Sequence, residues 1–326
     1  MDDEVEPIVY SKPPEMRRVC LLYLDILGYK QFVDIHKDKA YVLIDKTFQT
    51  AKLFMKNFNT LLDVDKIKFK GYSDNLILST ELDGVIEDYL IYHDMILLSA
   101  LLQDTAIVIC KLQFRGAVTA GYCLIDDYIY GDPFMEAHRL ESEVADWGRV
   151  MVSEEIVNAL RPYDNVLSHR IIEDQGGFYI DFLRMTNNPA TEENYKHNTE
   201  LLVESFIFMY QLALYYYKDI DTLGRLNSIA KIIHKNDKML TYISGFCKEN
   251  HLENLLNDVF REKLFYERMV DFENKYHNAT EDTAGEVMKS FQLLVEALPY
   301  YRKSLQIAKE SLKKHDYLDL TQYNDI

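Results

Sequence analysis

The sequence predicts an α+β fold, a ferredoxin-like palm followed by a C-terminal helical extension. An apolar, β-compatible run ends at Gly28, and a long helical pattern follows it. Two pairs of strands come next, separated by a second helical pattern, which gives the order β-α-β-β-α-β of the palm. Residues 191–315 instead have helical periodicity, with Pro299 as their single proline.

The first half of the palm is predicted from apolar runs and one turn. Residues 18–27 should form a strand that is buried on both faces, because nearly every side chain in the run is apolar. A helix is expected over residues 30–62. Two short strands, residues 66–70 and 75–80, are expected to be joined by a turn that carries Asp74.

The second half repeats this pattern. Apolar spacing predicts a helix over residues 82–110. A second strand pair, residues 112–120 and 122–130, is expected around Gly121. A helix over residues 133–145 should follow, since its first residue is a proline, which is favoured in the first turn.

Short elements are expected to complete the palm. They are a strand at 150–152, a helix from Ser153, and strands near 169–172 and 178–182, which the Gln-Gly-Gly sequence at 175–177 joins as a hairpin.

Composition divides the chain into three regions. Residues 1–16 contain three of the seven prolines and are expected to be a flexible lead-in. Residues 17–188 hold the predicted palm, which is the candidate catalytic domain. Residues 189–326, after an Asn-Asn-Pro sequence, form the predicted helical region.

Charge restricts the classes of partner. The chain has 326 residues, of which 53 are acidic and 36 basic, and its formal net charge is −17. Such a field repels polyanions, which argues against nucleic acid and anionic membrane as partners. A small nucleotide remains compatible, because divalent cations neutralise its phosphates locally.

Neither a disulfide framework nor a targeting segment is predicted. The four cysteines lack any CxxC spacing, and most of them lie in apolar runs. The N-terminus is acidic and has no apolar signal core, and no apolar stretch is expected to reach the roughly 20 residues of a membrane span. The sequence therefore predicts a cytoplasmic protein.

Two aspartates are predicted to lie at the ends of neighbouring strands. Asp25 ends the first strand and Asp74 lies in the next hairpin, so both carboxylates can bind Mg²⁺ or Mn²⁺, with the backbone carbonyl of Ile26 as a further oxygen ligand. Gly28 would let the backbone approach phosphate at a helix N-terminus. Two cations held about 3.5–4 Å apart suit in-line displacement at phosphorus. Aspartate beside glycine is also common turn chemistry, so each motif alone is a weak signal.

Taken in order, the motifs resemble those of class III nucleotide cyclase catalytic domains. The motifs are D-I-L-G-Y at 25–29, K-G-Y-S-D at 70–74, F-R-G-A-V-T-A-G at 114–121 and G-D-P-F-M-E-A-H-R-L-E at 131–141. The resemblance covers roughly residues 17–185 and implies the class III cyclase fold. It also implies a two-metal site with Mg²⁺ or Mn²⁺.

The resemblance assigns a role to each matching residue. It makes Asp25 and Asp74 metal ligands, and it places Lys70 at the base-contacting lysine. Arg139 falls at the arginine that stabilises the transition state, for which a guanidinium fork is suited. Gly28 and Tyr29, in the first motif, are placed at the substrate.

Arg139 has a simpler alternative, because Glu136 and Glu143 lie at helical spacing for a surface ion pair. His36 and His138 have no second ligand at metal spacing and are interpreted as ordinary histidines.

Two positions of the substrate site depart from the family pattern. Met135 stands where the family has asparagine, and Tyr128 stands where an acidic residue usually contacts the adenine amino group. A phenol can donate, accept or stack, so adenine specificity is not expected. These departures, the short first motif and the helical C-terminal region resemble the bacterial pyrimidine cyclases of Pycsar anti-phage defence.

That narrower resemblance implies a reaction and an assembly. UTP or CTP would be converted to 3′,5′-cyclic UMP or cyclic CMP and pyrophosphate, and the product would activate a separate effector. In the family the metal aspartates come from one subunit, and the lysine and arginine come from the other. A homodimer with two composite sites is therefore expected.

Other functions remain open. The chain could be a degenerate cyclase fold that signals without chemistry, or an adenylate or guanylate cyclase. A diguanylate cyclase or polymerase-like palm shares the strand order, but its G-G-[DE]-[DE]-F hairpin is absent here. A helical scaffold is a further alternative, which the C-terminal region favours.

Overall fold

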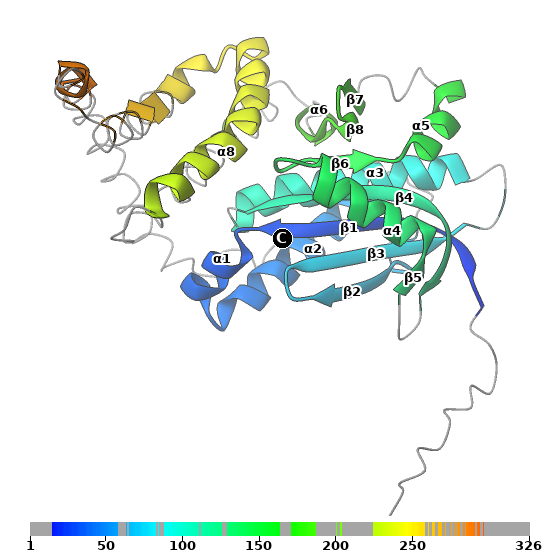
Figure 1. The fold of residues 1–326 in the computed structure, drawn as a ribbon. Helices are drawn as coiled ribbons and strands as arrows, with labels where there is room; N and C mark the ends of the chain where they lie inside the picture. The colour runs from blue at the N-terminus through cyan, green and yellow to red at the C-terminus, as the bar shows by residue number, and fades with distance from the viewer. Residues whose placement is uncertain are drawn as a thin grey trace, which may run out of the picture.

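Strand β1 (Arg17–Leu27) lies at the centre of the sheet, between β3 (Asn75–Glu81) and β4 (Gln113–Ile125) (Figure 1). The computed structural model describes residues 15–57, 63, 65–82, 84, 88–110, 112–125, 129–163, 171–186, 200, 203, 224–257 and scattered positions between 260 and 296.

The strand order of the sheet is that of the predicted palm. In the described residues it runs β2-β3-β1-β4-β6-β8-β7, and β5 pairs with β4. The first four strands pair antiparallel in the order β2-β3-β1-β4, which is the ferredoxin-like arrangement. The remaining bounds are β2 (Lys68–Tyr72), β5 (Ile129–Gly131), β6 (Val150–Val152), β7 (Ile171–Asp174) and β8 (Gly177–Ile180). The α+β prediction is confirmed.

Helices cover the two faces of the sheet. Figure 1 shows α4 (Asp132–Arg139) in front of the sheet and α3 (Asp88–Thr105) behind it. Tyr23 of β1 packs against Phe134 of α4, with ring centroids 5.9 Å apart. On the other side the buried Gln103 of α3 both donates to and accepts from the backbone of Phe114, at 2.8 Å each. The two faces of the sheet are therefore covered by different helices.

The core helix α3 is more apolar than the sequence analysis expected. With the π-helical turn Ala106–Cys110 it forms a 23-residue helix that is long and apolar enough to cross a membrane by length and composition. Within the fold, however, 78% of its most apolar window is buried. The expectation that no stretch approaches membrane length was wrong, and the burial is that of a core helix.

The predicted helix over residues 30–62 is divided in two. The structure has α1 (Tyr29–His36) and α2 (Lys39–Asn57), and Lys37 between them has a φ of 47°. A non-glycine residue in this region interrupts the helical hydrogen bonds, so the chain turns there. Residues 58–62 lie outside the described part.

The expected strand pair around Gly121 is wrong. Strand β4 continues through Gly121 to Ile125, and the hairpin partner is the three-residue β5. Gly121 has a φ of 150° within the strand, and a Cβ on it would also lie 3.2 Å from the ring of Pro133.

The remaining elements agree with the sequence except at their ends. Helix α4 continues into a π-helical turn, Leu140–Val144, and α5 (Glu154–Leu160) begins after Ser153. The last predicted strand ends earlier than expected, since Phe182 begins a short helix, α6 (Phe182–Thr186). The expected start of β7 at 169, the lead-in 1–14 and the boundary at 188 lie outside the described residues.

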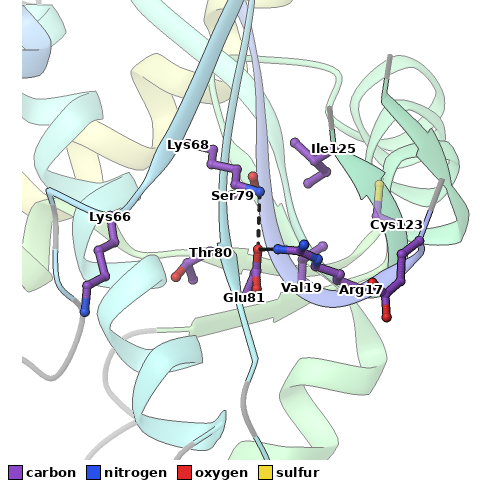
Figure 2. Close-up of a pocket in the computed structure, with 10 residues that line it drawn as sticks. Arg17, Val19, Lys66, Lys68, Ser79, Thr80, Glu81, Cys123 and Ile125 are labelled. Atoms are coloured by element: carbon purple, nitrogen blue, oxygen red, sulfur yellow. Dashed lines mark hydrogen bonds and ion pairs between the residues drawn. The ribbon is translucent and has the colours of Figure 1, made fainter. Parts of the chain in front are cut away.

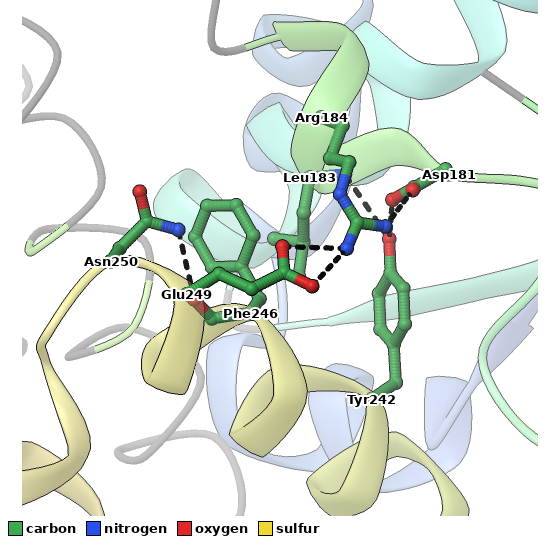
Figure 3. Close-up of polar contacts among 7 residues, drawn as sticks. All are labelled: Asp181, Leu183, Arg184, Tyr242, Phe246, Glu249 and Asn250. Carbon is green, nitrogen blue, oxygen red and sulfur yellow. Dashed lines mark hydrogen bonds and ion pairs between the residues drawn. The ribbon is translucent and has the colours of Figure 1, made fainter. Parts of the chain in front are cut away.

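Helix α8 (Gly224–Glu249) of the C-terminal region packs against the palm. Tyr242 of α8 lies among the rings of Trp147, Tyr179 and Phe182, with centroid distances of 5.5, 6.5 and 5.6 Å. Its hydroxyl donates to Asp181 Oδ1 at 2.6 Å, and Arg184 joins Asp181 to Glu249 (Figure 3). A 3₁₀ turn, Glu253–Leu256, follows the helix.

Replacing Tyr242 with phenylalanine is expected to lower the free energy of unfolding by about 2 kcal/mol, because a hydrogen bond to a buried carboxylate is lost. Burial raises the pKa of Tyr242 well above its usual value, so the phenol remains a donor across the working pH range. Urea denaturation measures the loss. Tyr41→Phe is the matched control, since Tyr41 is 76% exposed, and an equal loss in both variants would contradict the assignment.

Candidate active site

The two predicted metal aspartates lie together at one end of the sheet. Asp25 pairs with Asn75 across β1 and β3, and the N–H of Ile26 donates to the backbone oxygen of Asp74 at 2.8 Å. Asn75 also donates from its amide to Asp74 Oδ1 at 3.0 Å. The turn between β2 and β3 has Ser73 at a φ of 57°, which carries the chain tightly past the end of β1. The hairpin therefore holds both carboxylates at the same edge.

Glycine at position 28 is required by the backbone. Gly28 has a φ of 80° and caps α1, in a region that side chains with a Cβ rarely adopt. A Cβ there would meet nothing within 4 Å, so conformation and not space selects glycine. Tyr29 starts α1 and packs half-buried against the core.

Two residues to which the sequence analysis gave no role contact this end of the sheet. Arg115 of β4 lies opposite Asp25, and its Nη2 is 2.9 Å from Asp25 Oδ2. The same nitrogen lies 2.5 Å from Oε1 of the buried Glu141. Both residues lie inside the matched motifs, but their contact depends on strand register.

The carboxylates affect the neighbouring titratable groups. Burial raises the pKa of Glu141, and the negative charges of Asp25 and Asp74 raise it further, although Arg115 acts in the opposite direction. Burial, together with the same three carboxylates, raises the pKa of Tyr23 to about 12. The Tyr23 hydroxyl donates to Asn75. The end of the sheet is thus a region of concentrated negative charge.

These residues fit a divalent cation. Two carboxylates and a backbone carbonyl are hard oxygen donors of the type that Mg²⁺ and Mn²⁺ take. The guanidinium on Asp25 Oδ2 stands where a cation would bind, which shows that positive charge is accommodated there. Within the described residues, no group of three or more His, Cys, Asp or Glu side chains is placed to hold a metal.

The other predicted substrate residues lie farther along the same sheet face and on α4. Lys70 of β2 is in register with Ile77, which pairs with Tyr23, so Lys70 is on the same sheet face as Asp25. Met135 is 64% exposed on α4. Tyr128 lies outside the described residues.

Arg139 makes the ion pair that was its simpler alternative. Its Nε and Nη2 each lie 2.8 Å from a carboxylate oxygen of Glu136, and Nη1 is 3.9 Å from Glu143. Its side chain is 48% exposed, so these pairs hold it weakly. The arginine on Asp25 is instead Arg115.

A pocket of about 310 Å³ lies at the opposite end of this sheet face (Figure 2). Val19, in its floor, is six residues before Asp25 on β1, which is about 20 Å along a strand. Arg17 and Lys68 converge there on Glu81, at 2.6 and 3.2 Å. The pocket is lined by Glu15, Arg17, Val19, Lys66, Lys68, Ser79, Thr80, Glu81, Cys123 and Ile125.

The chain is similar to solved protein structures. No family model and no curated protein matches the chain. The crystal structure of the adenylyl cyclase CyaB from P. aeruginosa is similar to it, with a TM-score of 0.40 and 12% sequence identity, over 52% of this chain and 96% of that chain. At this level the likeness assigns neither substrate nor reaction to the present chain.

Proposed function

We propose that the protein is a nucleotide cyclase that converts UTP or CTP to the 3′,5′-cyclic nucleotide and pyrophosphate. The observation that carries this proposal is the placement of Asp25 and Asp74 at one edge of a palm sheet, tied by the hydrogen bond from Ile26. Its pyrimidine specificity and its role in Pycsar anti-phage defence rest on the sequence resemblance.

The ribose 3′-oxygen attacks the α-phosphorus, the bond to the pyrophosphate oxygen breaks, and the hydroxyl proton passes to solvent. Asp25, Asp74 and the Ile26 carbonyl would hold two Mg²⁺ or Mn²⁺ ions. When bound, such ions lower the pKa of the attacking hydroxyl and neutralise the triphosphate. Gly28 would let the backbone approach phosphate. Tyr29, the next residue, packs against the hydrophobic core.

The charge that develops on the α-phosphate would be stabilised by Arg139, whose guanidinium fork matches phosphate oxygens. Lys70 and Tyr128 would contact the base. Following the family resemblance, we propose that these groups come from a second copy of the chain; in its own chain Arg139 pairs with Glu136 and its side chain is 48% exposed. A two-fold homodimer would then have two composite sites.

The deciding experiment incubates the purified protein with each of the four nucleoside triphosphates and Mn²⁺, and identifies products by mass spectrometry. Cyclic UMP or cyclic CMP is expected as the main product, and Asp74→Ala should yield none. Cyclic AMP or cyclic GMP would correct the specificity, while a linear dinucleotide would indicate a different palm enzyme.

One observation favours a second candidate, a cyclase fold that binds nucleotide without turning it over. Met135 replaces a polar residue and is largely exposed. For this candidate the assay gives no cyclic product, yet UTP with Mg²⁺ still raises the melting temperature.

A further inference from the structure

Arg115 and Glu141 form a partly buried charged cluster with Asp25. One nitrogen, Nη2 of Arg115, faces Asp25 Oδ2 at 2.9 Å and Glu141 Oε1 at 2.5 Å. The side chains are 23%, 15% and 6% exposed for Arg115, Asp25 and Glu141. The guanidinium is therefore shared between a predicted cation ligand and a second carboxylate that is almost fully buried.

The cluster is not fully hydrogen-bonded. Among the described residues, Arg115 Nε and Glu141 Oε1 are buried without a hydrogen-bond partner, because the short ion pair between the two side chains lacks hydrogen-bond angles. Buried polar atoms are nearly always paired, and an exception requires an explanation. A second orientation of the guanidinium, with Nε turned toward Glu141 and Nη2 farther from Asp25, would give both atoms a partner.

A divalent cation at Asp25 would compete with this guanidinium for Oδ2. Moving Arg115 away from Asp25 with no other carboxylate in reach would leave a partly buried charge without a partner, which is unfavourable. Glu141 removes that penalty, since it already lies against the same nitrogen and can keep the ion pair.

We propose that Glu141 is a positioning residue that holds Arg115 beside Asp25 and retains the guanidinium when a divalent cation binds Asp25. The inference rests on the proposed cation site, and it adds that Glu141, through Arg115, sets the affinity of this site for the cation. The alternatives are that Glu141 only stabilises the fold, or that it acts on the cation itself.

A double-mutant cycle separates these roles. Mn²⁺ binding is measured by electron paramagnetic resonance of the free ion for the wild type, Glu141→Gln, Arg115→Gln and the double variant. Glu141→Gln is expected to weaken Mn²⁺ binding roughly tenfold, because Arg115 then has Asp25 as its remaining carboxylate. Arg115→Gln is expected to tighten binding. In the Arg115→Gln background, Glu141→Gln should change the affinity far less.

Equal losses in both backgrounds would overturn the proposal, because Glu141 would then act on the cation directly. No loss in either background would overturn it too, since Glu141 would be structural. If Glu141→Gln does not fold, Glu141→Asp keeps the charge but shortens the reach, and wild-type Mn²⁺ affinity in that variant would likewise count against the proposal.

The controls also separate this inference from the proposed function. Glu143→Gln removes the same charge two residues away at a 68% exposed side chain, and should leave the Mn²⁺ affinity unchanged. Asp25→Asn should abolish Mn²⁺ binding. If it does not, the cation site and the proposed function are both wrong. If it does while the cycle shows equal losses, only the role of Glu141 is wrong.

Discussion

Asp25→Asn is expected to lower cyclase activity on the order of 10³-fold, because it removes a cation ligand whose charge neutralises the triphosphate. Fold and dimer should persist, since Arg115 keeps its ion pair with Glu141.

Arg139→Ala is expected to lower activity about 10²–10³-fold, the usual loss when one donor to a developing charge is removed. Turnover of UTP and CTP, with melting temperature as the check on folding, measures both effects.

Together the two variants test whether the active site is composite. If Asp25 and Arg139 act on one substrate from different subunits, a mixed dimer has one intact site and one site with both defects. Random mixing makes half of the dimers mixed, so co-expression should restore about a quarter of wild-type activity. If both residues acted within one chain, every site would carry one of the two defects, so activity could not be restored. Failure to restore, with mixed dimers demonstrated, would place Asp25 and Arg139 in the same subunit.

The central strands and the positions of Asp25 and Asp74 in them were largely predictable, for a local reason. Strand β1 is nearly all apolar over its length, and the hairpin of β2 and β3 carries its turn residues between two β-rich runs. Asp25 and Asp74 each stand next to such a signal. That the end of β1 lies beside the turn of this hairpin followed from the palm order, since β1 pairs with β3.

Glycine was the main cause of error, because one residue type has two physical uses. At Gly28 it provides a positive φ, as a turn predicts. At Gly121, which also has a positive φ of 150°, it lets Pro133 approach a strand that continues through it, so the predicted turn does not exist. Sequence alone does not separate conformational need from lack of space.

The pair of Arg115 and Glu141 could not have been assigned from spacing. Arg115 is 90 residues from Asp25, and their contact is set by the register of β1 against β4. A one-residue shift would turn Arg115 to the opposite face of the sheet. Glu141 reaches the same point because a π-helical turn follows Arg139, a feature that hydrophobic periodicity does not indicate.

Gly116→Ala adds one methyl group and is expected to lower the free energy of unfolding more than any other substitution proposed for this protein. A Cβ on Gly116 would lie 2.9 Å from the carbonyl carbon of Tyr23, closer still to its oxygen, and 3.0 Å from Cα of Leu24. These are backbone atoms of the central strand, so no rotamer change relieves the overlap. Strand β4 is also tied on its far side, where the N–H of Gly116 donates to Arg149.

The expected loss in the free energy of unfolding is at least about 4 kcal/mol, which is the range of exceptional single substitutions. Gly245→Ala is the matched control, since a Cβ at this exposed position of α8 would meet nothing within 4 Å. Alanine is favoured over glycine in a helix, so this variant should gain up to about 1 kcal/mol. Urea denaturation of both variants gives the comparison, and losses of similar size would show that β1 and β4 are not packed as described. Because Asp25 and Arg115 flank the overlap, any folded fraction of Gly116→Ala should also bind Mn²⁺ more weakly than the wild type.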